Sequence, residues 1–120
     1  MNINNITIAG RLTNDPELTF IGEKNTPKTT FNLAVNRIGQ KDKTDFIPIE
    51  VFGVQAENCE KYLVKGQVAG VTGSLRIDSW QKDGNWHSRT YVAANSVQFG
   101  NKPNGKQEET RDEEPETVPF

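Results

Sequence analysis

The stretch QAENCEKYLVKG, residues 55–66, is where the hydrophobic pattern of the chain changes from a period of two to helical spacing. Ala56, Cys59 and Leu63 fall on one side of a helix, which predicts a helix through Lys65. Gly66 supplies a C-terminal stop. Because strands are indicated on both sides of this helix, its place in the order of strands decides the fold.

Five stretches around the helix alternate apolar and polar residues, as half-buried strands do. Three precede the helix and two follow it: 6–12, 29–36, 46–52, 68–77 and 88–99. Residues 17–20 are a candidate for a further short strand. The polar segment from Gly39 to Thr44 is interpreted as a loop.

Three local features refine these strands. Pro48 has no N–H to donate, so its strand is expected to lie at a sheet edge or a bulge at that point. The glycines of 68–77 suit a curved strand at a barrel corner. Asp83-Gly84 predicts a tight hairpin turn, with Trp80 and Trp86 facing each other across it.

The order of three strands, one helix and two strands is that of the OB-fold. This five-stranded Greek-key barrel commonly binds oligonucleotides or oligosaccharides across one face. We therefore expect an all-β OB-fold domain over residues 1–100, with Phe31 and Cys59 in its core. Apolar residues are absent from 100 to 117, which predicts a disordered linker at 101–112 and a disordered acidic tip at 113–120.

Length and composition agree with one small domain. The chain has 120 residues, of which 33% are hydrophobic, so its core is expected to be small or shared between subunits. No apolar run approaches the ~20 residues that span a bilayer, and no secretory signal is apparent. The single cysteine can form neither an internal disulfide nor a zinc site, which favours a reducing cytoplasm.

The formal net charge of −2 conceals an uneven distribution. Residues 108–120 hold six acids and one base, a net charge of −5, so the rest of the chain carries +3. A basic body with an acidic tail is a pattern found in polyanion-binding proteins.

Motifs spread along the chain resemble, in their order and spacing, the bacterial single-stranded DNA-binding protein family. They are GRLTNDPEL at 10–18, FNLAVNR at 31–37, FG at 52–53 with AE at 56–57, YLVKG at 62–66 and VTGSLR at 71–76. The resemblance implies an OB-fold, usually a homotetramer, that coats single strands without sequence preference in replication, recombination and repair.

Binding a strand of any sequence requires aromatic faces on which bases stack and cations along the backbone. The resemblance places stacking aromatics at Phe46, Phe52 and Trp80. Trp86 and Phe20 are added as candidates. Four of these have a structural alternative: Phe46, Phe52 and Phe20 can belong to the core, and Trp86 can simply stabilise the hairpin against Trp80.

The candidate phosphate contacts are basic residues along the expected path of the strand. They are Arg37, Lys41, Lys43, Lys65, Arg76 and Lys82, followed by Arg11, Lys28 and Arg89. Lys65 and Arg76 match basic positions of the family pattern. Asp78 stands near a position that is often basic, so we expect a shallower dependence of affinity on salt than is usual for the family.

Catalysis has no support in the sequence. His87 is the single histidine and has no nearby cysteine pair or carboxylate, so neither a zinc site nor a catalytic triad is indicated. Asp45 and Glu50 fall on opposite faces of a strand and form no carboxylate pair. We expect a binding protein without metal or cofactor.

The acidic tip combines two chemical characters. Its acids are Glu113, Glu114 and Glu116, and its apolar residues are Val118, Pro119 and Phe120. The resemblance implies that such a tip docks partner proteins: the apolar residues fit a pocket and the acids steer it to basic surfaces. A solubilising acidic tail is the alternative.

Two other functions remain open. A primosomal protein of the PriB type also binds single strands on an OB-fold but is usually dimeric and lacks such a tail. An adaptor would use the same face of the barrel to bind a polypeptide instead of DNA.

Overall fold

The computed structural model describes residues 1–103, except for the side chain of Lys41. The predictions for the linker beyond residue 103 and for the tip at 113–120 therefore lie outside the described residues.

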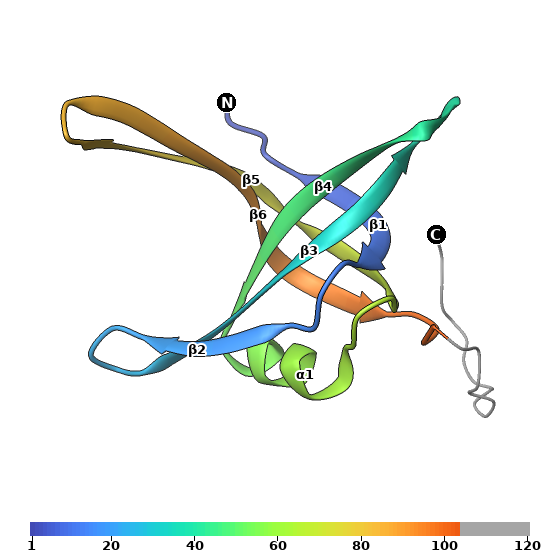
Figure 1. The fold of residues 1–120 in the computed structure, drawn as a ribbon. Coiled ribbons are helices and arrows are strands. Elements are labelled where there is room, and N and C mark those ends of the chain that lie inside the picture. Colours follow the sequence, from blue (N-terminus) through green and yellow to red (C-terminus); the bar gives the residue numbers. More distant parts are fainter. Residues whose placement is uncertain (104–120) are drawn as a thin grey trace.

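The described part contains six strands and one helix, arranged as Figure 1 shows. The elements are β1 (Ile6–Leu12), β2 (Glu17–Ile21), β3 (Thr26–Arg37), β4 (Gln40–Phe52), α1 (Val54–Tyr62), β5 (Val68–Lys82) and β6 (Asn85–Phe99).

The strands form one sheet that closes on itself. Its order is β1-β5-β6-β4-β3-β2, and the additional pairing of β1 with β3 joins the two sides. All pairings are antiparallel except a short parallel one between β4 and β6. Five strands thus make the barrel, with α1 between the third and the fourth of them, and the predicted OB-fold is confirmed. The candidate strand at 17–20 is real and forms β2, which pairs with β3.

The core lies inside the barrel and under α1. Alternate residues of β3 and β4 point inward, and Phe31, Leu33 and Ile49 are among the buried side chains. The hydroxyl of Thr29, in β3, donates a hydrogen bond of 2.6 Å to the carbonyl oxygen of Ala56 and fastens the helix to the barrel. Phe31 is in the core, as predicted.

Cys59 occupies the inner side of the helix, and its place in the core was predicted. The side chain is 1% exposed. Burial disfavours the thiolate and raises the pKa of the Cys59 thiol to about 11. The Cys59 thiol is therefore uncharged at neutral pH, and the side chain packs as a small apolar core residue.

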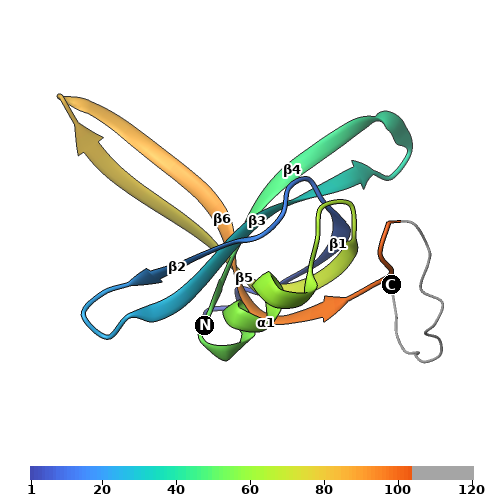
Figure 2. The same cartoon turned by 60° about the horizontal axis from the view of Figure 1, so that its bottom comes forward.

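Three hairpins project from the barrel, formed by β2–β3, β3–β4 and β5–β6 (Figures 1 and 2). The turn of the β5–β6 hairpin is Asp83-Gly84, with φ angles of 53° and 80°. Positive φ at both central residues belongs to the two-residue turn that follows the twist of the strands. The predicted hairpin is confirmed.

The loop predicted for Gly39 to Thr44 is wrong. β4 begins at Gln40, so that the turn is reduced to Ile38 and Gly39. Asn36 and Thr44 are paired across the hairpin, and the Thr44 hydroxyl donates to Asn36 Oδ1 at 2.8 Å. Both faces of this arm are polar, so the strand lacks the apolar alternation by which strands are recognised.

The helix is shorter than predicted. It ends at Tyr62, and Leu63 already has an extended backbone with a buried side chain. Gly66, expected to stop the helix, lies in the following turn with a φ of 86°. Burial of Leu63 in the core, rather than a glycine cap, accompanies the end of the helix.

Pro48 lies where its missing N–H is tolerated. Among the described residues, β4 pairs with β6 through Ile49 and Glu50, one position further along. Pro48 itself is paired with Asn32 of β3 on the other side. The predicted edge position is thereby confirmed.

We predict that Gly73→Ala destabilises the protein by about 1–3 kcal/mol because it overpacks a close approach of two strands. A Cβ at Gly73 would lie 2.1 Å from the carbonyl oxygen of Ala93. The β5–β6 register also shifts between Thr72 and Gly73, as the predicted curvature requires. Urea unfolding measures the change, with Ser74→Ala as the control. Equal stability of both variants would contradict the packing argument.

Candidate nucleic-acid interface

The register of β3 and β4 separates core-facing side chains from outward ones. Ile49 and Val51 are buried, so the alternate residues Phe46, Glu50 and Phe52 point to the outer side of β4. Lys28 of β3 stands directly opposite Phe52. Two exposed phenylalanines thus share one side of the strand with a base and an acid.

The same side continues onto the β5–β6 hairpin. Ile49 is paired with Val92, which is also buried, so Glu50 and its partner Ala93 both face outward. Following β6 by steps of two from Ala93 gives Tyr91, Arg89 and His87, and their partners on β5 are Arg76, Asp78 and Trp80. We call this side the aromatic face; it carries Phe46, Phe52, Trp80, His87, Tyr91, Lys28, Glu50, Arg76, Asp78 and Arg89.

Three of the five predicted stacking residues lie on the aromatic face and are accessible. Phe46, Phe52 and Trp80 are 66%, 42% and 43% exposed. Trp80 is stacked on His87, with ring centroids 5.7 Å apart and an angle of 23° between the planes. Flat aromatic surfaces open to solvent on one side of a sheet are the feature on which bases stack.

The other two candidates lie elsewhere. Trp86 is paired with Gln81, and Trp80 with His87, so the two tryptophans point to opposite sides of the hairpin. The prediction that they face each other is wrong, because the two-residue turn places residue 82 opposite 85. Phe20 is paired with Pro27, and alternation along β3 sets it on the side of Thr29, away from Lys28. Both aromatic side chains are exposed.

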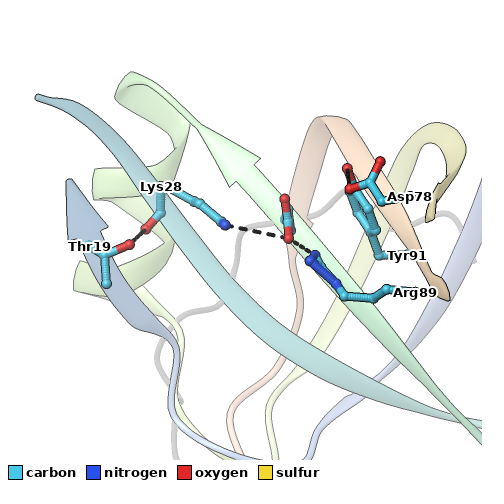
Figure 3. A network of polar contacts seen from close by, with 6 residues as sticks. Thr19, Lys28, Asp78, Arg89 and Tyr91 are labelled. Carbon is cyan, nitrogen blue, oxygen red and sulfur yellow. Dashed lines mark hydrogen bonds and ion pairs between the residues drawn. The ribbon is translucent and has the colours of Figure 1, made fainter. Parts of the chain in front are cut away.

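A buried carboxylate lies in the middle of the aromatic face. Glu50 is 5% exposed and forms ion pairs with Lys28, at 3.6 Å, and with Arg89. These two bases extend toward β4 from β3 and β6 (Figure 3). The Arg89 guanidinium also lies over the Tyr91 ring, 4.2 Å from its centroid, and the Tyr91 hydroxyl donates to Asp78 Oδ2 at 3.1 Å. Four strands are connected by this network.

Sequence reasoning missed Glu50 as a member of the site. A charged residue between two apolar ones, Ile49 and Val51, was visible in the sequence and is ordinary for the solvent side of a strand. Its burial depends on bases that are 22 and 39 residues away in the chain, Lys28 and Arg89. No local pattern specifies such pairs.

The remaining predicted cations differ in what they contact. Arg37 pairs with Asp45, Nη2 to Oδ1 at 3.1 Å, and the hydrogen bond and charge of Asp45 raise the pKa of Arg37. Arg11 donates from Nη1 to the carbonyl oxygen of Gly66 at 3.0 Å. Lys43, Lys65, Arg76 and Lys82 are exposed as well. Of these, Arg76 and Lys82 share the side of the hairpin that carries Trp80.

Other chemistry has little support in residues 1–103. No three side chains among His, Cys, Asp and Glu gather there as a metal site requires. His87 stacks on Trp80. None of the helical residues in this range forms a segment long and apolar enough to cross a membrane.

Comparisons with known proteins agree on one family. The model of the "Single-strand binding protein family" matches residues 3–100. A "Single-stranded DNA-binding protein" of Clostridium tetani is 43% identical over 107 residues, and the match covers 83% of this chain and 74% of the length of that protein. "Single-stranded DNA-binding protein 2" of Staphylococcus aureus is 44% identical over 107 residues, covering 81% and 72%. "Single-stranded DNA-binding protein 3" of Clostridium acetobutylicum is 42% identical over 101 residues, covering 81% and 70%.

Proposed function

This chain belongs to the single-strand binding protein family, and from that premise we propose that its aromatic face binds single-stranded DNA without reading the base sequence. The observation that carries the proposal is the exposure of Phe46, Phe52 and Trp80 on one side of the sheet. Each stacked base contributes about 1–3 kcal/mol, and every base has a face that stacks.

The proposed path of the bound DNA runs from the barrel onto the β5–β6 hairpin. Phe46 and Phe52 stack bases at β4, and Trp80 with His87 stacks them on the projecting arm. Exposed Arg76, on the same side of that arm, contacts phosphates. Cations of this kind neutralise phosphates of any sequence, which makes the binding dependent on salt.

The proposed activity is binding, without catalysis and without a cofactor. It serves replication, recombination and repair in the cytoplasm of a bacterial cell, by coating exposed single strands and preventing their re-annealing. Partner proteins of these processes dock on the tip at 113–120, through Val118, Pro119 and Phe120. The acids Glu113, Glu114 and Glu116 steer the tip toward basic surfaces.

The binding unit is a homo-oligomer, most simply the tetramer usual for the family. An apolar hollow of about 320 Å³ lies between β1, β4 and the hairpin arm, and Ile6, Ile8, Ile47 and Leu75 contribute to its lining. The nearby side chain of Ile77 is 61% exposed. Exposed apolar surface that is contiguous with a sheet is commonly covered by another subunit.

We predict that Trp86→Phe, which leaves Trp80 as the single tryptophan, retains strong fluorescence quenching by poly(dT) at low salt. Trp80→Phe leaves Trp86, on the opposite side of the arm, and should show weak quenching and an affinity reduced by at most about 1–3 kcal/mol, since a smaller ring still stacks. Absence of quenching and of binding in the unaltered protein would exclude DNA as ligand and favour the adaptor. Equal quenching in both variants would place DNA on both sides of the arm.

Deleting residues 118–120 is expected to leave DNA affinity unchanged or slightly higher, because the removed residues carry no charged side chain and lie outside the aromatic face. The same deletion should abolish capture of replication and repair proteins in a pull-down. The matched control replaces the acids 113, 114 and 116 by Gln and retains the apolar residues. Retained capture after the deletion would refute the docking role.

We expect mass measurement in solution to give four copies of the chain, in the presence or absence of DNA. Ile77→Lys, which puts a charge on the exposed apolar surface, should lower the mass, whereas Trp86→Phe should not. A dimer would instead agree with the PriB type of assembly, and a monomer would contradict a shared interface.

A further inference from the structure

The position of Glu50 is unusual for a surface that binds a polyanion. It lies on β4 between Phe46 and Phe52, two of the residues on which we propose that bases stack. Its side chain is nearly inaccessible, at 6%, whereas those of Lys28 and Arg89 are 25% and 41% exposed. The carboxylate is therefore enclosed by the chain, whereas the two basic side chains around it are partly exposed to solvent.

The enclosure has an energetic consequence for both bases. A buried carboxylate that loses a cationic partner is strongly destabilised, because its charge is no longer compensated. Lys28 and Arg89 are the two cations that pair with Glu50 in the described chain. A phosphate that withdrew either of them would leave the carboxylate with one partner.

Carboxylate and phosphate compete for the same donors. Both present oxygen atoms that accept charge-assisted hydrogen bonds from guanidinium and ammonium groups. Arg89 is held further by the ring of Tyr91, and Asp78 stands opposite Arg89 in the register of the arm. The Arg89 guanidinium is thus held in position by contacts within the protein before any DNA binds (Figure 3).

We propose that Glu50 is an affinity-limiting residue of the aromatic face, which holds Lys28 and Arg89 in place of the phosphates of a bound strand. The inference rests on the proposed function of this face. At the centre of the aromatic face, the bound DNA strand is held by stacking on Phe46 and Phe52. Its phosphates are neutralised by exposed bases such as Arg76. Binding consequently responds less to salt than the number of bases on the face suggests.

The test compares the Glu50→Gln variant with the unaltered protein. Each is titrated with a dT oligonucleotide over a series of salt concentrations. Releasing two bases for phosphate contacts should steepen the slope of log K against log salt by about 0.7 for each added contact, up to about 1.4. Affinity should rise most at low salt. Glu57→Gln, an equal change of charge at an exposed position of α1, should leave the slope unchanged.

Arg89→Gln in both backgrounds separates this role from a change of net charge. In the Glu50→Gln protein it should remove about 0.7 of the gained slope, because Arg89 is then a phosphate contact. In the unaltered protein it should change the slope by less than half of that amount. A thermal melt verifies that each variant is folded, and the Arg89→Gln measurement stands if Glu50→Gln does not fold.

The outcomes are distinct. An unchanged or shallower slope in folded Glu50→Gln overturns the inference, as does a loss of about 0.7 caused by Arg89→Gln in the unaltered protein. If the unaltered protein binds no oligonucleotide at low salt, the proposed function itself fails. If that protein binds with a salt-dependent affinity and Glu50→Gln does not differ from it, the failure is confined to the role of Glu50.

Discussion

The barrel depends on a short parallel contact of two residue pairs between β4 and β6, Ile49 with Val92 and Glu50 with Ala93. The first pair points inward and is almost fully buried, so it joins the two halves of the core. The second pair points outward and makes the aromatic face continuous from β4 to β6. Toward their N-terminal ends β4 and β6 diverge, and each belongs to a hairpin that projects from the barrel (Figure 2).

This short contact also explains the charge network. β4 and β6 share only two paired positions, and on the outer side of this contact Arg89 of β6 pairs with Glu50 of β4. Lys28 approaches from β3, the other neighbour of β4. The carboxylate thereby strengthens the junction of β4 with β6, which has little backbone pairing, and its charge is balanced from both sides.

The β5–β6 hairpin has two parts with different tasks. Up to Gly73, β5 packs in the barrel, and Ala69 and Val71 belong to the core. The register shift at Gly73 then bends the strand, and from Leu75 onward every residue of β5 is exposed. The barrel thus contains the core, and the arm presents Trp80 to solvent without drawing on the core.

Much of the fold was accessible to sequence reasoning. The helix, the five barrel strands, the Asp83-Gly84 turn, Phe31 in the core and the curvature near Gly73 were predicted and are confirmed. Each rests on a local rule, such as alternation of apolar residues or positive φ at a tight turn. The polar arm of β3 and β4 was not predicted, since both of its faces contact water.

The order of elements, the family and the supply of aromatic and basic residues could be predicted from the sequence, because these depend on neighbours along the chain. Which of those residues lie together depends on the tertiary structure. Turn length sets the register, and the register puts Trp80 with Phe46 and Phe52 but Trp86 on the opposite side. The pairs of Glu50 likewise exist only once closure of the barrel brings together strands that are far apart in sequence.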